Sequence, residues 1–206
     1  CFVRKVVFDG KLAVGLEVDL EGKTVNLMGQ SIILAGGAIG SPHLLMLSGV
    51  GPSRHICDFD ISVIHDLPGV GENLRDHPQV RTSWRVRDDF YQEPGKPVVQ
   101  VTLRYTATGS PFSNDMLIHP ATNVTVGNRV VGHGVSEEHG LAMVVCLDLE
   151  VSSGSLRLRD RDPYVQPLLD YNFLEEEFDR VRMREGIRIC IDLAESDGWS
   201  KLVKER

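Results

Sequence analysis

Residues 37–51 read Gly-Ala-Ile-Gly-Ser-Pro-His-Leu-Leu-Met-Leu-Ser-Gly-Val-Gly, and this stretch decides the fold of the chain. It follows an apolar run at residues 31–36, which predicts a buried strand. Ser41 then predicts a helix N-cap, with Pro42 in the first helical turn. A strand, a glycine-rich turn and a helix start together can hold a diphosphate, because the backbone approaches the ligand closely and free N–H groups point outward.

A second motif lies downstream at residues 67–78, which read Leu-Pro-Gly-Val-Gly-Glu-Asn-Leu-Arg-Asp-His-Pro. In this order and at this spacing, the two motifs resemble signature segments of the glucose–methanol–choline (GMC) flavoprotein oxidoreductases. Residues 153–159, 162–163 and 167–174 resemble the opening of that family's C-terminal region. The resemblance covers most of the chain and weakens only between residues 86 and 145. The competing interpretation of the first motif is a generic α/β strand–turn–helix unit, because glycine-rich turns are common.

Composition narrows the function classes. The chain has 206 residues, of which 42% are hydrophobic and 25% charged, as in ordinary globular proteins. Its net charge of -7 argues against nucleic-acid binding, which needs clustered Lys and Arg. No apolar run is long enough for a membrane span, and the first residues lack the layout of a signal peptide, so we expect a cytoplasmic protein.

Cysteines and histidines give no metal site by their spacing along the chain. The four cysteines are widely separated and form no CxxC pair, so we expect reduced, mostly buried thiols rather than a disulfide framework or a zinc site. His77 lies in an Asp-His-Pro turn, where Asp76 could orient it as a general base. The favoured interpretation is a structural turn, and the sequence therefore assigns no catalytic residue and no metal ligand.

The hydrophobic pattern predicts two domains with a boundary near Pro78. Residues 1–78 hold an antiparallel hairpin that turns at Asp9-Gly10-Lys11, a second turn at residues 21–23, the strand–turn–helix unit and a short strand at 61–64. Residues 79–206 hold a run of strands without intervening helices, which predicts an antiparallel sheet. The expected strands are at residues 81–87, 98–105, 116–119, 141–147 and 155–159, and a glycine-rich loop is expected over 127–140.

A helix is predicted from Glu175 to about Ser196, because apolar residues recur there at steps of three and four. Phe178, Val181, Ile189 and Leu193 are expected to face the sheet. With the family resemblance, the fold class is α/β and α+β. It comprises part of a Rossmann-like FAD-binding domain (1–78) and part of an antiparallel-sheet substrate domain with a packed helix (79–206).

The resemblance also implies a cofactor, a reaction and contact residues. Family members bind FAD and oxidise a small-molecule alcohol by hydride transfer to the flavin. By this resemblance, the backbone near Val3 contacts the adenine, and the turn Ala35-Gly36-Gly37 lies beside the ADP half of the cofactor. Alternatively, Val3 is an ordinary core residue of a strand, and the glycines serve only close helix–strand packing.

Two elements of the family pattern do not occur in these 206 residues. The sequence has no Gly-x-Gly-x-x-Gly followed by an acidic residue, and no segment that matches the family's catalytic histidine. We therefore expect an internal fragment of an FAD-dependent alcohol oxidase or dehydrogenase that is inactive as an isolated chain. The alternative is a truncated relative that serves as a non-catalytic binding or interaction module.

Overall fold

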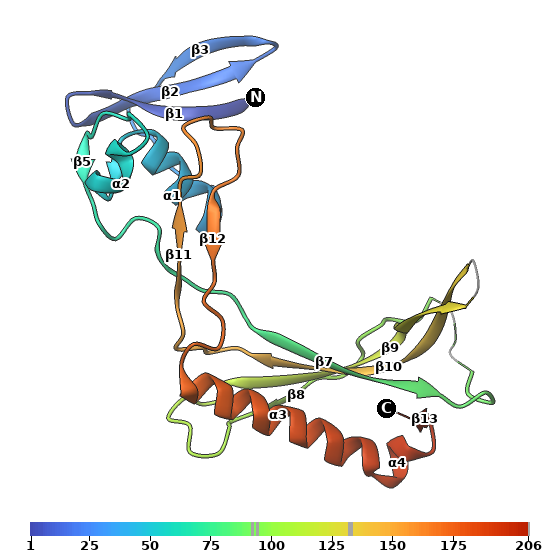
Figure 1. Ribbon diagram of the computed structural model, residues 1–206. Helices are drawn as coiled ribbons and strands as arrows, with labels where there is room; N and C mark the ends of the chain where they lie inside the picture. Colours follow the sequence, from blue (N-terminus) through green and yellow to red (C-terminus); the bar gives the residue numbers. More distant parts are fainter. Residues whose placement is uncertain (92, 94, 132–133, 206) are drawn as a thin grey trace. The chain divides into compact units, whose positions relative to one another are not determined.

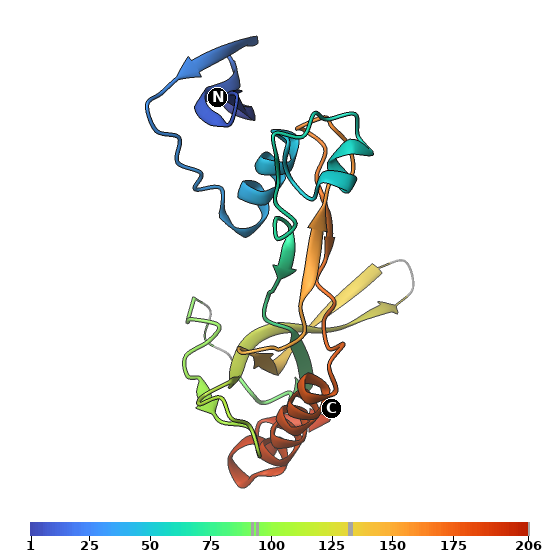
Figure 2. The ribbon, with the colours of Figure 1, turned by 90° about the vertical axis from the view of Figure 1, so that its left-hand side faces the viewer.

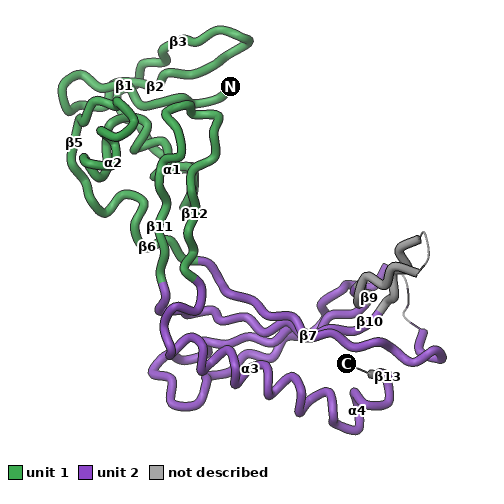
Figure 3. Tube along the Cα trace, in the orientation of Figure 1, with its two compact units in different colours: residues 1–75, 153–172 green, residues 76–152, 173–206 purple. Residues whose placement is uncertain are grey.

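The computed structural model describes residues 1–91, 93, 95–131 and 134–205. The chain forms two compact units (Figure 3): unit 1 comprises residues 1–75 and 153–172, and unit 2 comprises 76–152 and 173–206. The chain first passes from unit 1 to unit 2 between Arg75 and Asp76, close to the predicted boundary at Pro78. Residues 153–172 differ from the prediction, because they return to unit 1. They do so because strand β11 (Gly154–Arg157) pairs with β6 (Glu72–Leu74) and with β12 (Leu168–Asp170).

Unit 1 begins with a three-stranded antiparallel sheet, β1 (Phe2–Asp9), β2 (Leu12–Leu20) and β3 (Lys23–Met28). Both predicted turns are confirmed, with Gly10 and Gly22 at positive φ. The Ser48 hydroxyl ties this sheet to the following helix, because it accepts a hydrogen bond from the Val6 amide at 2.8 Å and donates one to the Leu44 carbonyl at 2.6 Å.

Helix α1 (Gly37–Leu47) begins earlier than predicted. Gly36 takes the N-cap position, the Ser41 hydroxyl accepts a hydrogen bond from the Gly36 amide at 3.0 Å, and Pro42 lies inside the helix. The predicted strand at 31–36 is wrong: no described residue pairs with this segment, and Ile33 is 86% exposed. An apolar run becomes a strand only where an adjacent strand offers hydrogen bonds to its backbone N–H and C=O groups.

Three short elements follow α1: β4 (Val50–Gly51), α2 (Ser53–Cys57) and β5 (His65–Asp66), with β4 parallel to β5. The strand predicted at 61–64 is wrong, because ladder pairing begins only at His65. Glycines in the two sequence motifs allow the backbone of unit 1 to approach neighbouring backbone closely. A Cβ on Gly49 would lie 2.3 Å from the Ser62 carbonyl oxygen, and one on Gly71 would lie 2.3 Å from that of Leu156. Both residues also have positive φ, which only glycine adopts readily.

Unit 2 is built on an antiparallel sheet of strand order β13-β7-β10-β9-β8. Its strands are β7 (Gln79–Val86), β8 (Leu103–Tyr105), β9 (Met116–Val131), β10 (Gly134–Leu147) and β13 (Val203–Glu205). The predicted antiparallel sheet is confirmed, and so is the mixed α/β class. The loop expected over 127–140 is instead mostly strand, because the β9–β10 ladder continues to the pair Val131↔Gly134. Of the strand expected at 98–105, only β8 and a bridge from Val99 to Ala121 are present.

Helix α3 (Glu177–Glu195) lies along one face of this sheet, and the short helix α4 (Asp197–Ser200) follows it (Figures 1 and 2). The helix is confirmed, but its predicted orientation is only partly right: Ile189 packs against the core of unit 2, whereas two of the four expected residues are exposed. Val181 and Leu193 are 45% and 39% exposed, and Phe178 and Ile189 are only half-buried. The buried positions are Asp179, Arg182, Met183, Gly186, Cys190 and Ala194.

Two features of α3 explain why these residues are the ones that face the sheet. A Cβ on Gly186 would lie 2.4 Å from a Val145 methyl carbon, so the helix backbone approaches β10 closely at that point. Asp179 and Arg182, which a hydrophobicity pattern assigns to solvent, face inward because they are paired there. Within the described part of the chain, no helix combines the length and the apolar character that a bilayer crossing requires.

Arg182 forms the buried ion pairs of unit 2. Its guanidinium, 1% exposed, donates to Asp115 at 2.7 Å and to Asp179 at 2.6 Å, and both carboxylates are fully buried. Asp115 also accepts hydrogen bonds from the Ala107 amide and the Ser110 hydroxyl. Burial acts to raise the pKa of Asp115, but these hydrogen bonds outweigh it and the pKa lies below the usual value.

We expect Arg182→Met to destabilise unit 2 by about 3–5 kcal/mol, because it leaves two buried carboxylates without their counter-charge. Denaturant unfolding followed by tryptophan fluorescence measures this, since the only tryptophans, Trp84 and Trp199, pack edge-to-face in unit 2 with ring centroids 5.8 Å apart. The matched control is Arg188→Met, at an exposed position of the same helix, which should change stability little. A loss for Arg182→Met no larger than for the control would contradict the expectation.

We expect unit 1 to lose stability as the pH falls below 6.5. The Leu158 amide donates to His55 Nε2 at 2.9 Å, which requires a neutral imidazole, and burial lowers the pKa of His55 from 6.5. Below pH 6.5 His55 takes up a proton more readily in the unfolded chain than in the folded unit, because its pKa is lower in the folded state. The contribution of neutral His55 to the free energy of unfolding is therefore complete above pH 6.5 and declines at lower pH. Hydrogen exchange of the Leu158 amide between about pH 8 and about pH 5 measures this.

His55→Gln should reduce this pH dependence, because a glutamine oxygen accepts the bond at every pH. Burial also lowers the pKa of His43, which adds a pH dependence of its own. The role of His55 is therefore tested by comparing the His55→Gln variant with the unaltered chain. His65→Gln, at an exposed position of the same unit, is the control. An unchanged pH dependence in His55→Gln would rule out this role.

Candidate functional site

A pocket of about 370 Å³ in unit 1 gathers segments that are distant in the sequence. Val3 of β1, Ala35 and Gly36 all line it, and these are three of the four residues predicted to contact a cofactor. Further lining comes from the side chains of α1 and from Pro163, Gln166 and Pro167 near β12. The hairpin, the irregular segment before α1 and the residues that return to unit 1 therefore meet at one pocket.

Gly36 and Gly37 differ in their surroundings. A Cβ on Gly36 would lie 3.0 Å from the Ser41 amide nitrogen, so a side chain at this position would press on the start of α1. Its own N–H is already bonded to Ser41 and does not point outward as the sequence suggested. Gly37 does not line the pocket; it has a φ of +72°, and a Cβ there would meet nothing within 4 Å.

The walls of this pocket are mostly apolar, with Ser41, His43 and Gln166 as the polar side chains among its lining. His43 is half-buried, and its Nε2 atom is buried without a hydrogen bond to any described residue. Burial lowers the pKa of His43, so its imidazole is neutral near pH 7. A pocket of this kind suits a flat, largely apolar ring better than a multiply charged group.

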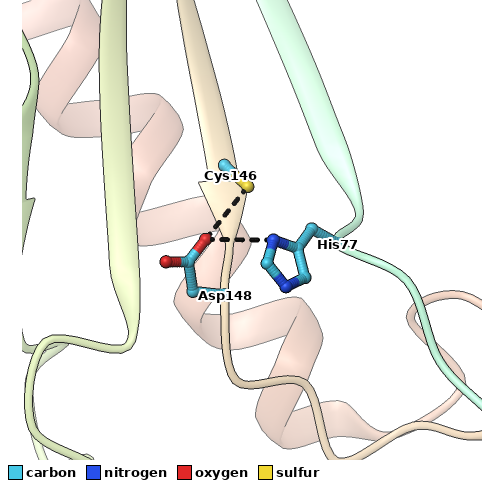
Figure 4. Close-up of side chains that lie close together, drawn as sticks. All are labelled: His77, Cys146 and Asp148. Carbon is cyan, nitrogen blue, oxygen red and sulfur yellow. Dashed lines mark hydrogen bonds and ion pairs between the residues drawn. The ribbon is translucent and has the colours of Figure 1, made fainter.

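A second cluster lies in unit 2, where His77, Cys146 and Asp148 come together (Figure 4). His77 Nδ1 lies 3.3 Å from Asp148 Oδ1, and the Cys146 thiol donates to the same oxygen at 3.3 Å. The carboxylate that faces the His77 ring is therefore Asp148. Asp76, the partner considered from the sequence, accepts a hydrogen bond from the backbone amide of His77 instead.

Burial sets the reactivity of this cluster. Cys146 is buried and Asp148 nearly so, whereas the His77 side chain is 52% exposed. Burial, with the hydrogen bond to Asp148, raises the pKa of the Cys146 thiol to about 12. Sequence reasoning missed Cys146 and Asp148 because they are far from His77 along the chain. Only the β7–β10 register, with Gln79 opposite Cys146, brings them together.

Comparison with known proteins gives the family. Two models described as GMC oxidoreductase match the chain, one over residues 1–79 and the other over residues 150–206. The chain belongs to the GMC oxidoreductase family. Both sequence motifs of unit 1 fall within the first match, and the returning strands β11 and β12, with α3, fall within the second.

Relatives within the GMC family include an oxygen-dependent choline dehydrogenase of Escherichia coli O17:K52:H18 (strain UMN026 / ExPEC). It is 31% identical over 211 residues, which cover 91% of this chain and 38% of that protein. Among solved structures, formate oxidase from Aspergillus oryzae RIB40 has a TM-score of 0.82 at 24% identity, covering 99% of this chain and 44% of that chain. Pyridoxine 4-oxidase from Mesorbium loti has a TM-score of 0.82 at 20% identity, covering 98% and 40%.

The chain thus spans less than half the length of this choline dehydrogenase and of these two solved structures. FAD is the cofactor of this family: the formate oxidase study concerns modification of its FAD, and another matched structure is an FAD-dependent oxidoreductase from Chaetomium thermophilum with a TM-score of 0.70. The expected family, flavoprotein class and cofactor are therefore confirmed.

Proposed function

We propose that this chain is part of an FAD-dependent oxidoreductase that oxidises an alcohol to an aldehyde by hydride transfer to the flavin. The observation that carries the proposal is the pocket where Val3, Ala35 and Gly36 meet, within the region that matches the family. When bound, FAD would supply the hydride acceptor. The relatives support an alcohol as substrate class: a choline dehydrogenase, a pyridoxine 4-oxidase and a fungal aryl-alcohol oxidase are among them, beside the formate oxidase.

Unit 1 is the cofactor-binding part in this proposal. Its pocket has apolar walls and the bare backbone of Gly36, which fit a flat adenine ring. Val3, Ala35 and Gly36 would contact the adenine and ADP portions of FAD, and Gly37 would lie beside the same portion at the start of α1. The pocket offers no cationic side chain to a diphosphate, and the chain lacks Gly-x-Gly-x-x-Gly, so these residues would hold the adenine end only.

Unit 2 is the substrate-binding part in this proposal, as an antiparallel sheet backed by α3. The hydroxyl proton of an alcohol needs a positioned base, which typically contributes ~10²–10⁴-fold to the rate. We assign no catalytic base among the 206 residues. The second candidate function is a non-catalytic binding module of the same family.

We expect Gly36→Val to weaken binding of ADP, used as the adenine-bearing probe, by at least about tenfold, which corresponds to ~1.4 kcal/mol. The branched side chain would enter the pocket lining and press on the Ser41 amide. Val3→Trp, which fills the pocket from β1 and leaves Gly36 unaltered, should have the same effect, and Gly37→Val a smaller one. Isothermal titration calorimetry of the purified chain measures these affinities.

The matched control for this titration is Gly69→Ala, at an exposed glycine of unit 1 where a Cβ would meet nothing within 4 Å. Its ADP affinity should equal that of the unaltered chain. Equal affinity in Val3→Trp and in the control would remove this pocket from the proposal.

We expect residues 1–206 by themselves to hold little FAD and to turn over no alcohol. The diphosphate of FAD normally receives backbone N–H groups and a helix dipole from the glycine motif that these residues lack. Flavin absorbance of the purified protein, and an assay of primary alcohols with an artificial electron acceptor, measure both quantities. A stoichiometric yellow protein with turnover would contradict this expectation, and His77→Gln would then be the first base variant to assay.

A further inference from the structure

We infer that His77, Cys146 and Asp148 form a binding site for a divalent transition-metal ion, with zinc as the ion that fits best. The three side chains offer one nitrogen, one sulfur and one oxygen, all within 4.8 Å of one another. Zinc holds such ligands at about 2.0–2.3 Å in tetrahedral geometry, which places ligand atoms about 3.3–3.8 Å apart. The separations of 3.3 Å from Asp148 Oδ1 to His77 Nδ1 and to Cys146 Sγ already meet that requirement.

The backbone holds these three residues in place. Cys146 is the last residue of β10 that pairs with β7, opposite Gln79. The Leu147 amide then donates to the Pro78 carbonyl at 3.1 Å, and the Asp148 amide donates to the Asp115 carbonyl at 2.9 Å. The positions are therefore set by the sheet and by the segment that carries Asp115. Such rigid support reduces the entropy that a metal ion must overcome on binding.

Two neighbouring side chains support the ligands from outside. Arg104 donates to Asp148 Oδ2 at 3.1 Å, which orients the carboxylate and leaves Oδ1 directed at His77 and Cys146. The Gln79 amide points its Nε2 at Cys146 Sγ at 3.8 Å, where it can stabilise a thiolate. Outer contacts of this kind orient metal ligands and tune their basicity.

Metal binding here exchanges a proton for an ion. The S–H bond of Cys146, whose hydrogen now points at Asp148, breaks, its proton passes to solvent, and a sulfur–metal bond forms. The half-exposed His77 ring provides access, and three protein ligands leave a fourth position for water or a small anion. A mixed N, S and O set excludes calcium and magnesium, which prefer oxygen ligands only.

The test is titration of the whole 206-residue chain with Co²⁺, a spectroscopic substitute for zinc. We expect one Co²⁺ per chain, with a thiolate-to-cobalt charge-transfer band in the near ultraviolet and the visible bands of a tetrahedral ion. Added Zn²⁺ should abolish these bands at one equivalent. A bound Co²⁺ without the charge-transfer band would overturn the proposal, because Cys146 would not be a ligand.

Variants separate this site from adventitious thiols. Cys146→Ser should abolish the charge-transfer band, and His77→Gln should lower the Co²⁺ affinity at least about tenfold, the smallest loss typical even of outer-shell changes. Cys57→Ser and His65→Gln, at exposed positions of unit 1, are the matched controls and should leave the band unchanged.

A band lost in Cys57→Ser, or kept in both Cys146→Ser and His77→Gln, would refute the site. If the buried Cys146→Ser chain fails to fold, as tryptophan fluorescence would show, the exposed His77→Gln variant still decides. In that case, unchanged Co²⁺ affinity in His77→Gln refutes the proposal.

Discussion

The buried guanidinium of Arg182 is the interaction on which unit 2 depends. It joins α3 to the segment that enters β9, through Asp115, and it fixes Asp179, which accepts hydrogen bonds from the Val151 and Ser152 amides. A cation removed from water is tolerated only when its partners saturate it, and here two carboxylates and the face of the Phe178 ring surround it. The orientation of α3 on the sheet follows from this pairing together with the close approach of Gly186 to β10.

The ion pairs of Arg182 also support the cluster of His77, Cys146 and Asp148. Asp115, held by Arg182, offers its carbonyl to the Asp148 amide. Asp148 in turn faces His77 and Cys146, and Arg104 holds its other oxygen. A charged network that is fully satisfied is rigid, and rigidity is what a ligand site needs before the ligand arrives. The structural core of unit 2 and its candidate metal site are thus one continuous set of hydrogen bonds.

Unit 1 depends on a different constraint, the close approach of backbone to backbone. Gly49 and Gly71 lie where a Cβ would meet a carbonyl oxygen, and both occur in the motifs that resemble the GMC family. These glycines let the chain fold tightly between α1, β5 and β11. In the same unit Val3, Ala35 and Gly36 lie around one pocket, although β1 and the start of α1 are far apart in the sequence.

Sequence alone determined the local features: the two glycine turns of the hairpin, the antiparallel character of unit 2, the extent of α3, and the family through its two motifs. Periodicity and turn chemistry are properties of neighbouring residues, so a single sequence carries them. Only the tertiary structure decided the unpaired state of residues 31–36, the return of 153–172 to unit 1, the inward face of α3, and the meeting of His77 with Cys146 and Asp148. Strand pairing and buried charge pairs join residues distant along the chain, and their free energy depends on partners that no local pattern identifies.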